Sequence, residues 1–146
     1  MKWIATLGPI GYLPASGTCA TLATLLMIHC LHLLHISWFT YGLILVVCLL
    51  GGLYAIQQTH KQFASRDPRE IVIDEVVGCF CTFLFIPWTV QTALLGFLLF
   101  RFFDITKSCG IRFLERPAGA LGIMLDDVGA GIISNIILHG VLWFST

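Results

Sequence analysis

The sequence has few charged residues. Asp, Glu, Lys and Arg make up 11% of its 146 residues, whereas soluble domains usually contain about 25%. Hydrophobic residues reach 58% and the mean hydropathy is +0.91, so the chain has too few polar side chains to cover a core in water. A lipid bilayer removes that need. We therefore predict an integral membrane protein, with a buried subunit of a larger complex as the alternative.

Several motifs that would assign another function are missing as well. The formal net charge is +0, and nucleic-acid binding calls for a basic face, so no nucleic-acid partner is expected. The six cysteines have no C-x-x-C spacing and stand mostly in apolar runs, where we interpret them as packing residues. No D-x-D sequence is present for an aspartyl-nucleophile phosphatase. No cysteine is followed six positions later by the arginine that a cysteine-phosphatase loop needs.

Long uncharged stretches are what the chain has instead. A helix that crosses the hydrocarbon core needs about 20 apolar residues. We therefore predict a single domain, residues 1–146, with an all-α fold of about five to six helices in a compact, multi-pass membrane protein. The stretches without Asp, Glu, Lys or Arg are residues 20–36, 38–56, 76–100 and 128–144.

The third stretch contains Pro87 and can be interpreted in two ways. It is either one long helix kinked at the proline or a re-entrant pair that turns back near Pro87. All Lys and Arg residues except Lys2 lie between Lys61 and Arg116. A turn at Pro87 puts every base on one side of the membrane, as the positive-inside rule requires, whereas a single crossing leaves four on each side. We therefore predict the turn, which also places every carboxylate on the cytoplasmic side.

Two adjacent pairs of acids stand where apolar stretches begin. Asp74 and Glu75 precede the third stretch, and Asp126 and Asp127 precede the fourth. Acids at the start of a helix complement its dipole, which is the ordinary explanation for this position. A second pair in the same setting favours a functional role, because carboxylates beside a membrane are costly without a partner.

A fifth acid stands among bases just after the third stretch. Arg101, Asp104 and Lys107 are spaced by three residues, so successive members of the series can meet on one helix surface. A ladder of ion pairs at the membrane edge is one interpretation. The other is an acid for a metal ion beside bases for a phosphate group, with Arg112 as a further base.

Together these residues are typical of metal-assisted phosphate chemistry. Hard cations such as Mg²⁺ take oxygen ligands from one or two carboxylates, from water and from phosphate oxygens. Such an ion can polarise a phosphoryl oxygen and generate a hydroxide nucleophile. Nearby bases can neutralise charge on the phosphoryl group. The candidate carboxylates are Asp74, Glu75, Asp104, Asp126 and Asp127.

The segment at residues 8–18 is rich in Gly, Pro and Ser and leads into the first apolar stretch. Free backbone N–H groups at the start of that helix could bind an anion. An ordinary turn at the membrane interface is the alternative for this segment.

Three blocks of the sequence carry a family resemblance. They are residues 11–18, 67–78 and 100–131, and the most specific piece runs from Gly122 to Asp127 and is followed by Ala130 and Gly131. In this order they resemble the phosphatidylglycerophosphatase A family, from about Leu7 to Ser134. The resemblance implies an all-α, Mg²⁺-dependent phosphatase of the bacterial inner membrane that removes the terminal phosphate of phosphatidylglycerophosphate to give phosphatidylglycerol.

The resemblance also implies roles for single residues. Mg²⁺ would be held by Asp74, Glu75, Asp126 and Asp127, with Asp104 as a further ligand or a base. The expected phosphate-binding residues are Thr18, Arg101, Lys107 and Arg112. The active site would lie on the cytoplasmic face, with a phospholipid as the partner.

The sequence departs from the family pattern at backbone positions. Ser16 stands where the family usually has proline, Ser108 and Gly110 replace two further prolines, and Ala120 replaces the second glycine of a pair. These changes leave the titratable groups in place. A catalytically weak homologue and a small membrane cation-binding protein are the alternatives, and the second would need acids at mid-membrane depth.

Overall fold

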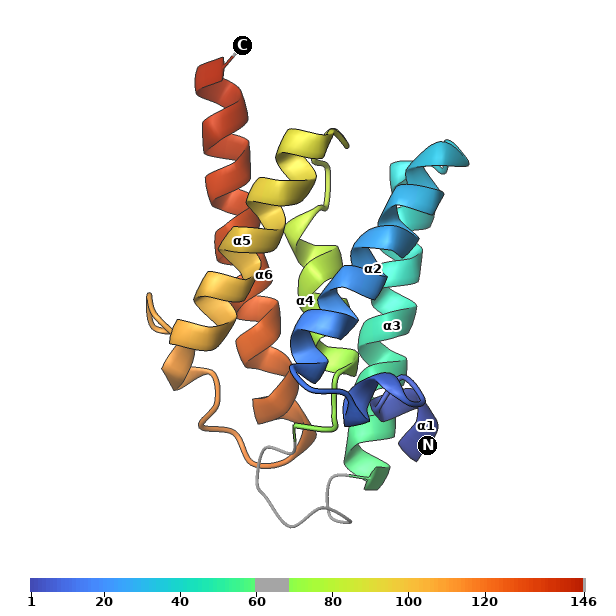
Figure 1. Ribbon diagram of the computed structural model, residues 1–146. Helices are drawn as coiled ribbons and strands as arrows, with labels where there is room; N and C mark the ends of the chain where they lie inside the picture. Colours follow the sequence, from blue (N-terminus) through green and yellow to red (C-terminus); the bar gives the residue numbers. More distant parts are fainter. Residues whose placement is uncertain (60–68, 146) are drawn as a thin grey trace.

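The computed structural model describes residues 1–59 and 69–145, and this part of the chain contains helices and no strand (Figure 1). The all-α prediction is confirmed. Two short 3₁₀ helices, η1 (Ile10–Tyr12) and η3 (Ile111–Phe113), flank the longer elements. The α-helices are α1 (Lys2–Ala5), α2 (Ser16–Leu33), α3 (Trp38–Thr59), α4 (Ile73–Thr82), α5 (Val90–Thr106) and α6 (Ala120–Ser145).

Three helices are long and apolar enough to cross a membrane, namely α2, α3 and residues 120–144 of α6. Helix α4 has only 10 residues, and α5 runs back beside it in the opposite direction, so that the pair begins and ends at the same end of the bundle (Figure 1). The predicted turn near Pro87 is therefore confirmed, and residues 76–100 do not form one crossing helix.

Side chains satisfy the backbone groups that this turn exposes. The side-chain amide of Asn135 on α6 donates to the carbonyls of Thr82 and Leu84, at 3.0 and 2.8 Å, just where α4 ends. Thr89 and Thr92 form a capping box at the start of α5, and the Thr92 hydroxyl donates to the carbonyl of Pro87 at 2.8 Å. A chain can break at membrane depth only where such partners replace the lost helical bonds.

Helix α4 lies at the centre of the bundle and packs against α2, α3, α5 and α6. Glycines allow its close approach to α6. A Cβ atom on Gly78 would lie 2.6 Å from the carbonyl oxygen of Asp127, and one on Gly131 would lie 2.9 Å from Cβ of Cys81. Gly78 and Gly131 thus permit close packing of the two helices, and the approach sets the start of α4 beside Asp127.

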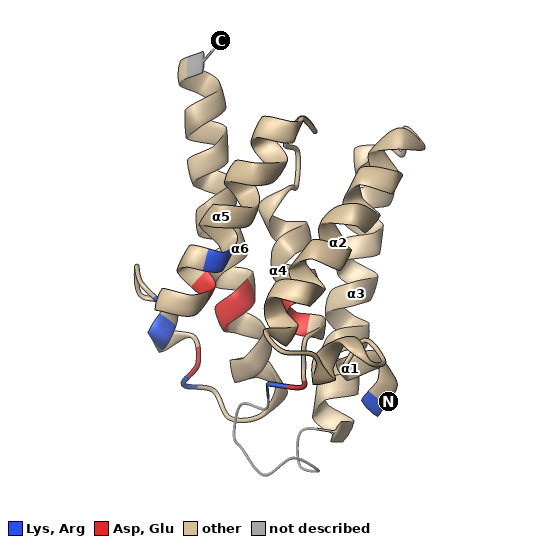
Figure 2. Ribbon diagram, viewed as in Figure 1, with Lys and Arg blue, Asp and Glu red and all other residues tan. Residues whose placement is uncertain are grey.

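The charged residues gather toward one end of the bundle. In Figure 2 the described Lys, Arg, Asp and Glu residues lie at the N-terminus, at the start of α4, on the lower part of α5, on α6 and in the loops at that end. Lys61, Arg66 and Asp67, which the positive-inside argument and the second family block included, lie outside the described residues. Among the residues that the structure describes, the upper half of the bundle in this view holds no charged side chain.

Candidate active site

A cavity of about 620 Å³ opens at the charged end of the bundle. Its walls come from residues 11–18, residues 69–71, the first turn of α4, the last turns of α5 and the second turn of α6. Five segments that are distant in the sequence thus meet around one space. All five acids predicted for the site line it.

Three carboxylates form the most compact group in the cavity. One side-chain oxygen from each of Asp74, Glu75 and Asp127 lies within 4.8 Å of the others. Asp74 and Asp127 are only 7% and 3% exposed. We call these three residues the carboxylate cluster.

The helix dipole accounts for only part of this cluster. Asp74 and Glu75 stand in the first turn of α4, where the dipole favours acids. The carboxylate of Asp127 lies beyond the first turn of α6, which begins at Ala120, and the effect of the dipole is confined to that turn. A different source of stabilisation is needed for Asp127.

The donor set of the cluster fits a hard divalent cation. Three like charges in a water-poor site repel one another strongly. Oxygen Oε2 of Glu75 is buried and accepts no hydrogen bond from any residue of the described ranges. Carboxylate oxygens are the ligands that Mg²⁺ and Ca²⁺ prefer, so a cation would satisfy this oxygen and offset the repulsion.

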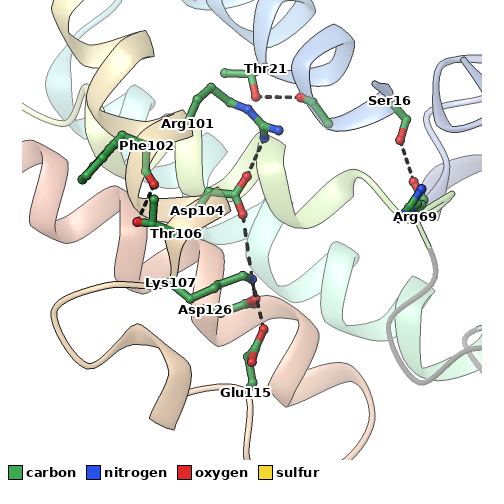
Figure 3. A network of polar contacts seen from close by, with 11 residues as sticks. Ser16, Thr21, Arg69, Arg101, Phe102, Asp104, Thr106, Lys107, Glu115 and Asp126 are labelled. Atoms are coloured by element: carbon green, nitrogen blue, oxygen red, sulfur yellow. Dashed lines mark hydrogen bonds and ion pairs between the residues drawn. The ribbon is translucent and has the colours of Figure 1, made fainter. Parts of the chain in front are cut away.

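A series of ion pairs runs beside the cluster along the end of α5 (Figure 3). Arg101 Nη1 contacts Asp104 Oδ2 at 2.5 Å, and Lys107 Nζ lies 3.8 Å from Asp104 Oδ1. The predicted spacing of three residues is therefore realised as contacts. Lys107 also pairs with Asp126 and lies 3.3 Å from Glu115. Asp126 thus contacts a lysine, and it is not among the three acids that form the cluster.

Lys107 stays protonated in this setting. Burial lowers the pKa of its ammonium group, but the hydrogen bond to Asp126 and the charges of Asp126, Asp127 and Asp104 raise it by more. The net result is a pKa above its ordinary value. Its backbone adopts a left-handed conformation with φ of 50°, which ends α5 and turns the side chain toward α6.

The start of α2 forms the opposite wall of the cavity. Ala15 precedes the helix in a left-handed conformation and makes no side-chain cap, so the first backbone N–H groups of α2 are left for another partner. The hydroxyl of Ser16 donates to the carbonyl of Arg69 at 2.6 Å and fixes this wall to the segment before α4. Free N–H groups at a helix start, beside Arg101, suit an anion.

Gly17 lets this wall approach the acids and bases. A Cβ atom at residue 17 would lie 3.0 Å from Nη1 of Arg101 and would collide with Oε1 of Glu75. The start of α2, Glu75 of the carboxylate cluster and Arg101 therefore converge on one point, and a Cβ atom at residue 17 would push the ends of these two side chains aside.

Most of the predicted site residues come together, with one exception. Thr18, Arg101 and Lys107 line the cavity. Arg112 lies on η3 with an exposed side chain and does not line it. The sequence argument missed Arg69 and Glu70, which do line it. Both fall within the second family block, which was the available signal, whereas nothing in the sequence pointed to the contact between Glu115 and Lys107.

Fold and site together define a class: a helical membrane protein with a carboxylate cluster and partly buried bases around a cavity at one end. The sequence model of phosphatidylglycerophosphatase A matches residues 3–142. The chain belongs to the phosphatidylglycerophosphatase A family.

Three curated proteins are similar to this chain. The phosphatidylglycerophosphatase A of Escherichia coli is 36% identical over 71% of the chain and 62% of its own length. The phosphatidylglycerophosphatase A of Haemophilus influenzae is 38% identical over 70% of the chain and 64% of its own length. A putative phosphatidylinositol-3-phosphatase of Bacteroides thetaiotaomicron is 36% identical over 73% of the chain and 67% of its own length. The chain thus spans less than two thirds of the first of these relatives. No solved structure matches it.

Proposed function

We propose that the protein is a Mg²⁺-dependent lipid phosphatase that removes the terminal phosphate of phosphatidylglycerophosphate and releases phosphatidylglycerol. The observation that carries this proposal is the carboxylate cluster beside two partly buried bases and a free helix start, all in one cavity. Acids for a cation and donors for an anion are the two halves of a phosphate-transfer site. The names of the relatives from E. coli and H. influenzae support the substrate.

Each group in the cavity has a distinct part in this proposal. Asp74, Glu75 and Asp127 would hold the Mg²⁺ ion. The chemistry that such an ion supplies when bound is polarisation of a phosphoryl oxygen and a lowered pKa of bound water. Arg101 donates to the phosphate from α5, and the N–H groups at the start of α2 donate from the opposite wall.

The remaining acids position these donors. Asp104 contacts both Arg101 and Lys107, and Asp126 contacts Lys107. Such contacts fix the long basic side chains before the substrate arrives, which reduces the entropy lost on binding. We assign Asp104 and Asp126 this positioning role, and we assign Lys107 the neutralisation of charge that develops on the phosphoryl group.

The proposed location is the bacterial inner membrane, with the cavity at the cytoplasmic face. The described bases gather at the cavity end of the bundle, and basic residues favour the cytoplasmic side. A lipid substrate in the inner leaflet would then present its phosphate at the depth of the cavity.

Phosphate release from phosphatidylglycerophosphate by the purified chain in detergent micelles tests the proposal. Release should stop with excess EDTA and return when Mg²⁺ exceeds the chelator. Phosphatidylinositol 3-phosphate is the comparison substrate, since one relative carries the name of a phosphatase for that lipid, and it should react more slowly. Release that EDTA leaves unchanged would contradict the metal requirement, and faster release from the inositol lipid would contradict the substrate.

A further inference from the structure

The cavity is lined by exposed apolar side chains as well as by polar ones. Leu13, between η1 and α2, and Ile105, near the end of α5, both line the cavity and are 47% and 69% exposed. Arg69 and Glu70 line it from the segment before α4. The cavity is thus polar inside, and two apolar side chains from different elements stand at its mouth.

The exposure of these two side chains is not explained by packing. Neither belongs to the hydrophobic core or to the apolar side chains packed against it. They stand close in sequence to the groups assigned to the phosphate, because Ile105 follows Asp104 directly and Leu13 comes four residues before Gly17. Leu13 and Ile105 thus line the same cavity as Arg101 and the start of α2, and a ligand whose phosphate reaches those groups can contact both side chains where they are exposed.

We propose that Leu13 and Ile105 form a lipid entrance, which contacts the glycerol backbone and the first acyl methylenes of the substrate. This inference rests on the proposed function and assigns the preference for a membrane-anchored phosphomonoester, over a water-soluble one, to two residues. A polar interior with an apolar mouth matches a ligand that has a phosphate at one end and acyl chains at the other. Contacts with apolar parts of a ligand contribute binding free energy in proportion to the apolar area removed from water.

Serine substitutions at the entrance separate lipid binding from catalysis. Leu13→Ser and Ile105→Ser should each lower kcat/KM for dioleoyl phosphatidylglycerophosphate by about tenfold, mainly through KM, because each removes one apolar contact. For the deacylated headgroup, glycerophosphoglycerophosphate, kcat/KM should stay within about twofold of the wild-type value. Both side chains lie outside the core, so the variants should remain folded.

Phe102→Ser is the matched control. Phe102 lies three residues before Ile105 on the same helix and is 57% exposed, but it does not line the cavity. Its replacement should leave kcat/KM unchanged for both the lipid and the deacylated headgroup.

Two kinds of result would overturn the inference. One is an equal loss on the lipid and on the deacylated headgroup in the entrance variants, and the other is no loss on the lipid. In both cases the wild-type protein still releases phosphate from the lipid, so the proposed function survives. If the wild-type protein releases phosphate from neither substrate, the proposed function fails and the inference fails with it.

Discussion

Replacing Asp127 with asparagine is expected to lower kcat for phosphate release by about 10³-fold. The substitution keeps the shape of the side chain but removes one of the three charges that face the cation. Loss of metal-based stabilisation of the transition state is worth several kcal/mol, and each 1.36 kcal/mol corresponds to a tenfold change in rate. The measurement is the initial rate of phosphate release from phosphatidylglycerophosphate at saturating substrate.

Two controls separate this effect from misfolding and from a general change in charge. Arg112→Gln also removes one charge, but Arg112 lies outside the cavity, so kcat should stay within about threefold. The metal-free Asp127→Asn protein should unfold at a temperature no lower than the metal-free wild type, because the substitution relieves repulsion in the cluster. Asp127→Asn at the full wild-type rate would exclude the cluster from catalysis.

Replacing Gly17 with alanine is expected to lower kcat/KM by about 100-fold. The added methyl group would meet the side-chain ends of Glu75 and Arg101, so both ends must shift from their positions in the cavity. Displacement of a catalytic group by about 1 Å can cost a factor of 10². The measurement is kcat/KM for the lipid substrate, together with the unfolding temperature.

Gly51→Ala provides the matched control for this substitution. Gly51 is also a helical glycine, but a Cβ atom there would meet nothing within 4 Å. Alanine at that position should leave activity unchanged and should not lower the unfolding temperature, since it favours the helix. If Gly17→Ala retains the wild-type kcat/KM, the close convergence of α2 with Glu75 and Arg101 has no part in function.

The turn at Pro87 and the grouping of the acids could be predicted from the sequence because each follows from a one-dimensional pattern. The bases before and after residues 76–100 fall on one side of the membrane only if this stretch does not cross it once. The distribution of bases along the chain therefore required the stretch to turn back. The spacing of Arg101, Asp104 and Lys107 fixed their mutual contacts, because helix geometry alone brings such residues together.

The partners of the acids across helices could not be predicted in this way. Asp126 and Asp127 are adjacent in sequence, yet one contacts Lys107 and the other faces Asp74 and Glu75. That division depends on the rotation of α6 against α4, which the contact between Gly78 and Gly131 determines. The start of α6 at Ala120, six residues before Asp126, could not be predicted either, because no charged residue marks it.

Arg112 shows the limit of a motif taken as a linear string. The resemblance placed it with Lys107 because the two stand five residues apart in one family block. Between them the chain leaves α5 at Lys107 and enters η3, where Arg112 is exposed. A loop that changes direction separates side chains that a helix of the same length would keep on related faces.

The central claim, that the carboxylate cluster is a divalent-cation site, is tested most directly by thermal unfolding without substrate. The purified protein in detergent is first treated with EDTA and then titrated with MgCl₂. A cation that binds only the folded chain should raise the unfolding temperature of the wild type by roughly 5–10 °C near saturation, with little change in Asp127→Asn. No rise in the wild type, or an equal rise in Asp127→Asn, would contradict the claim.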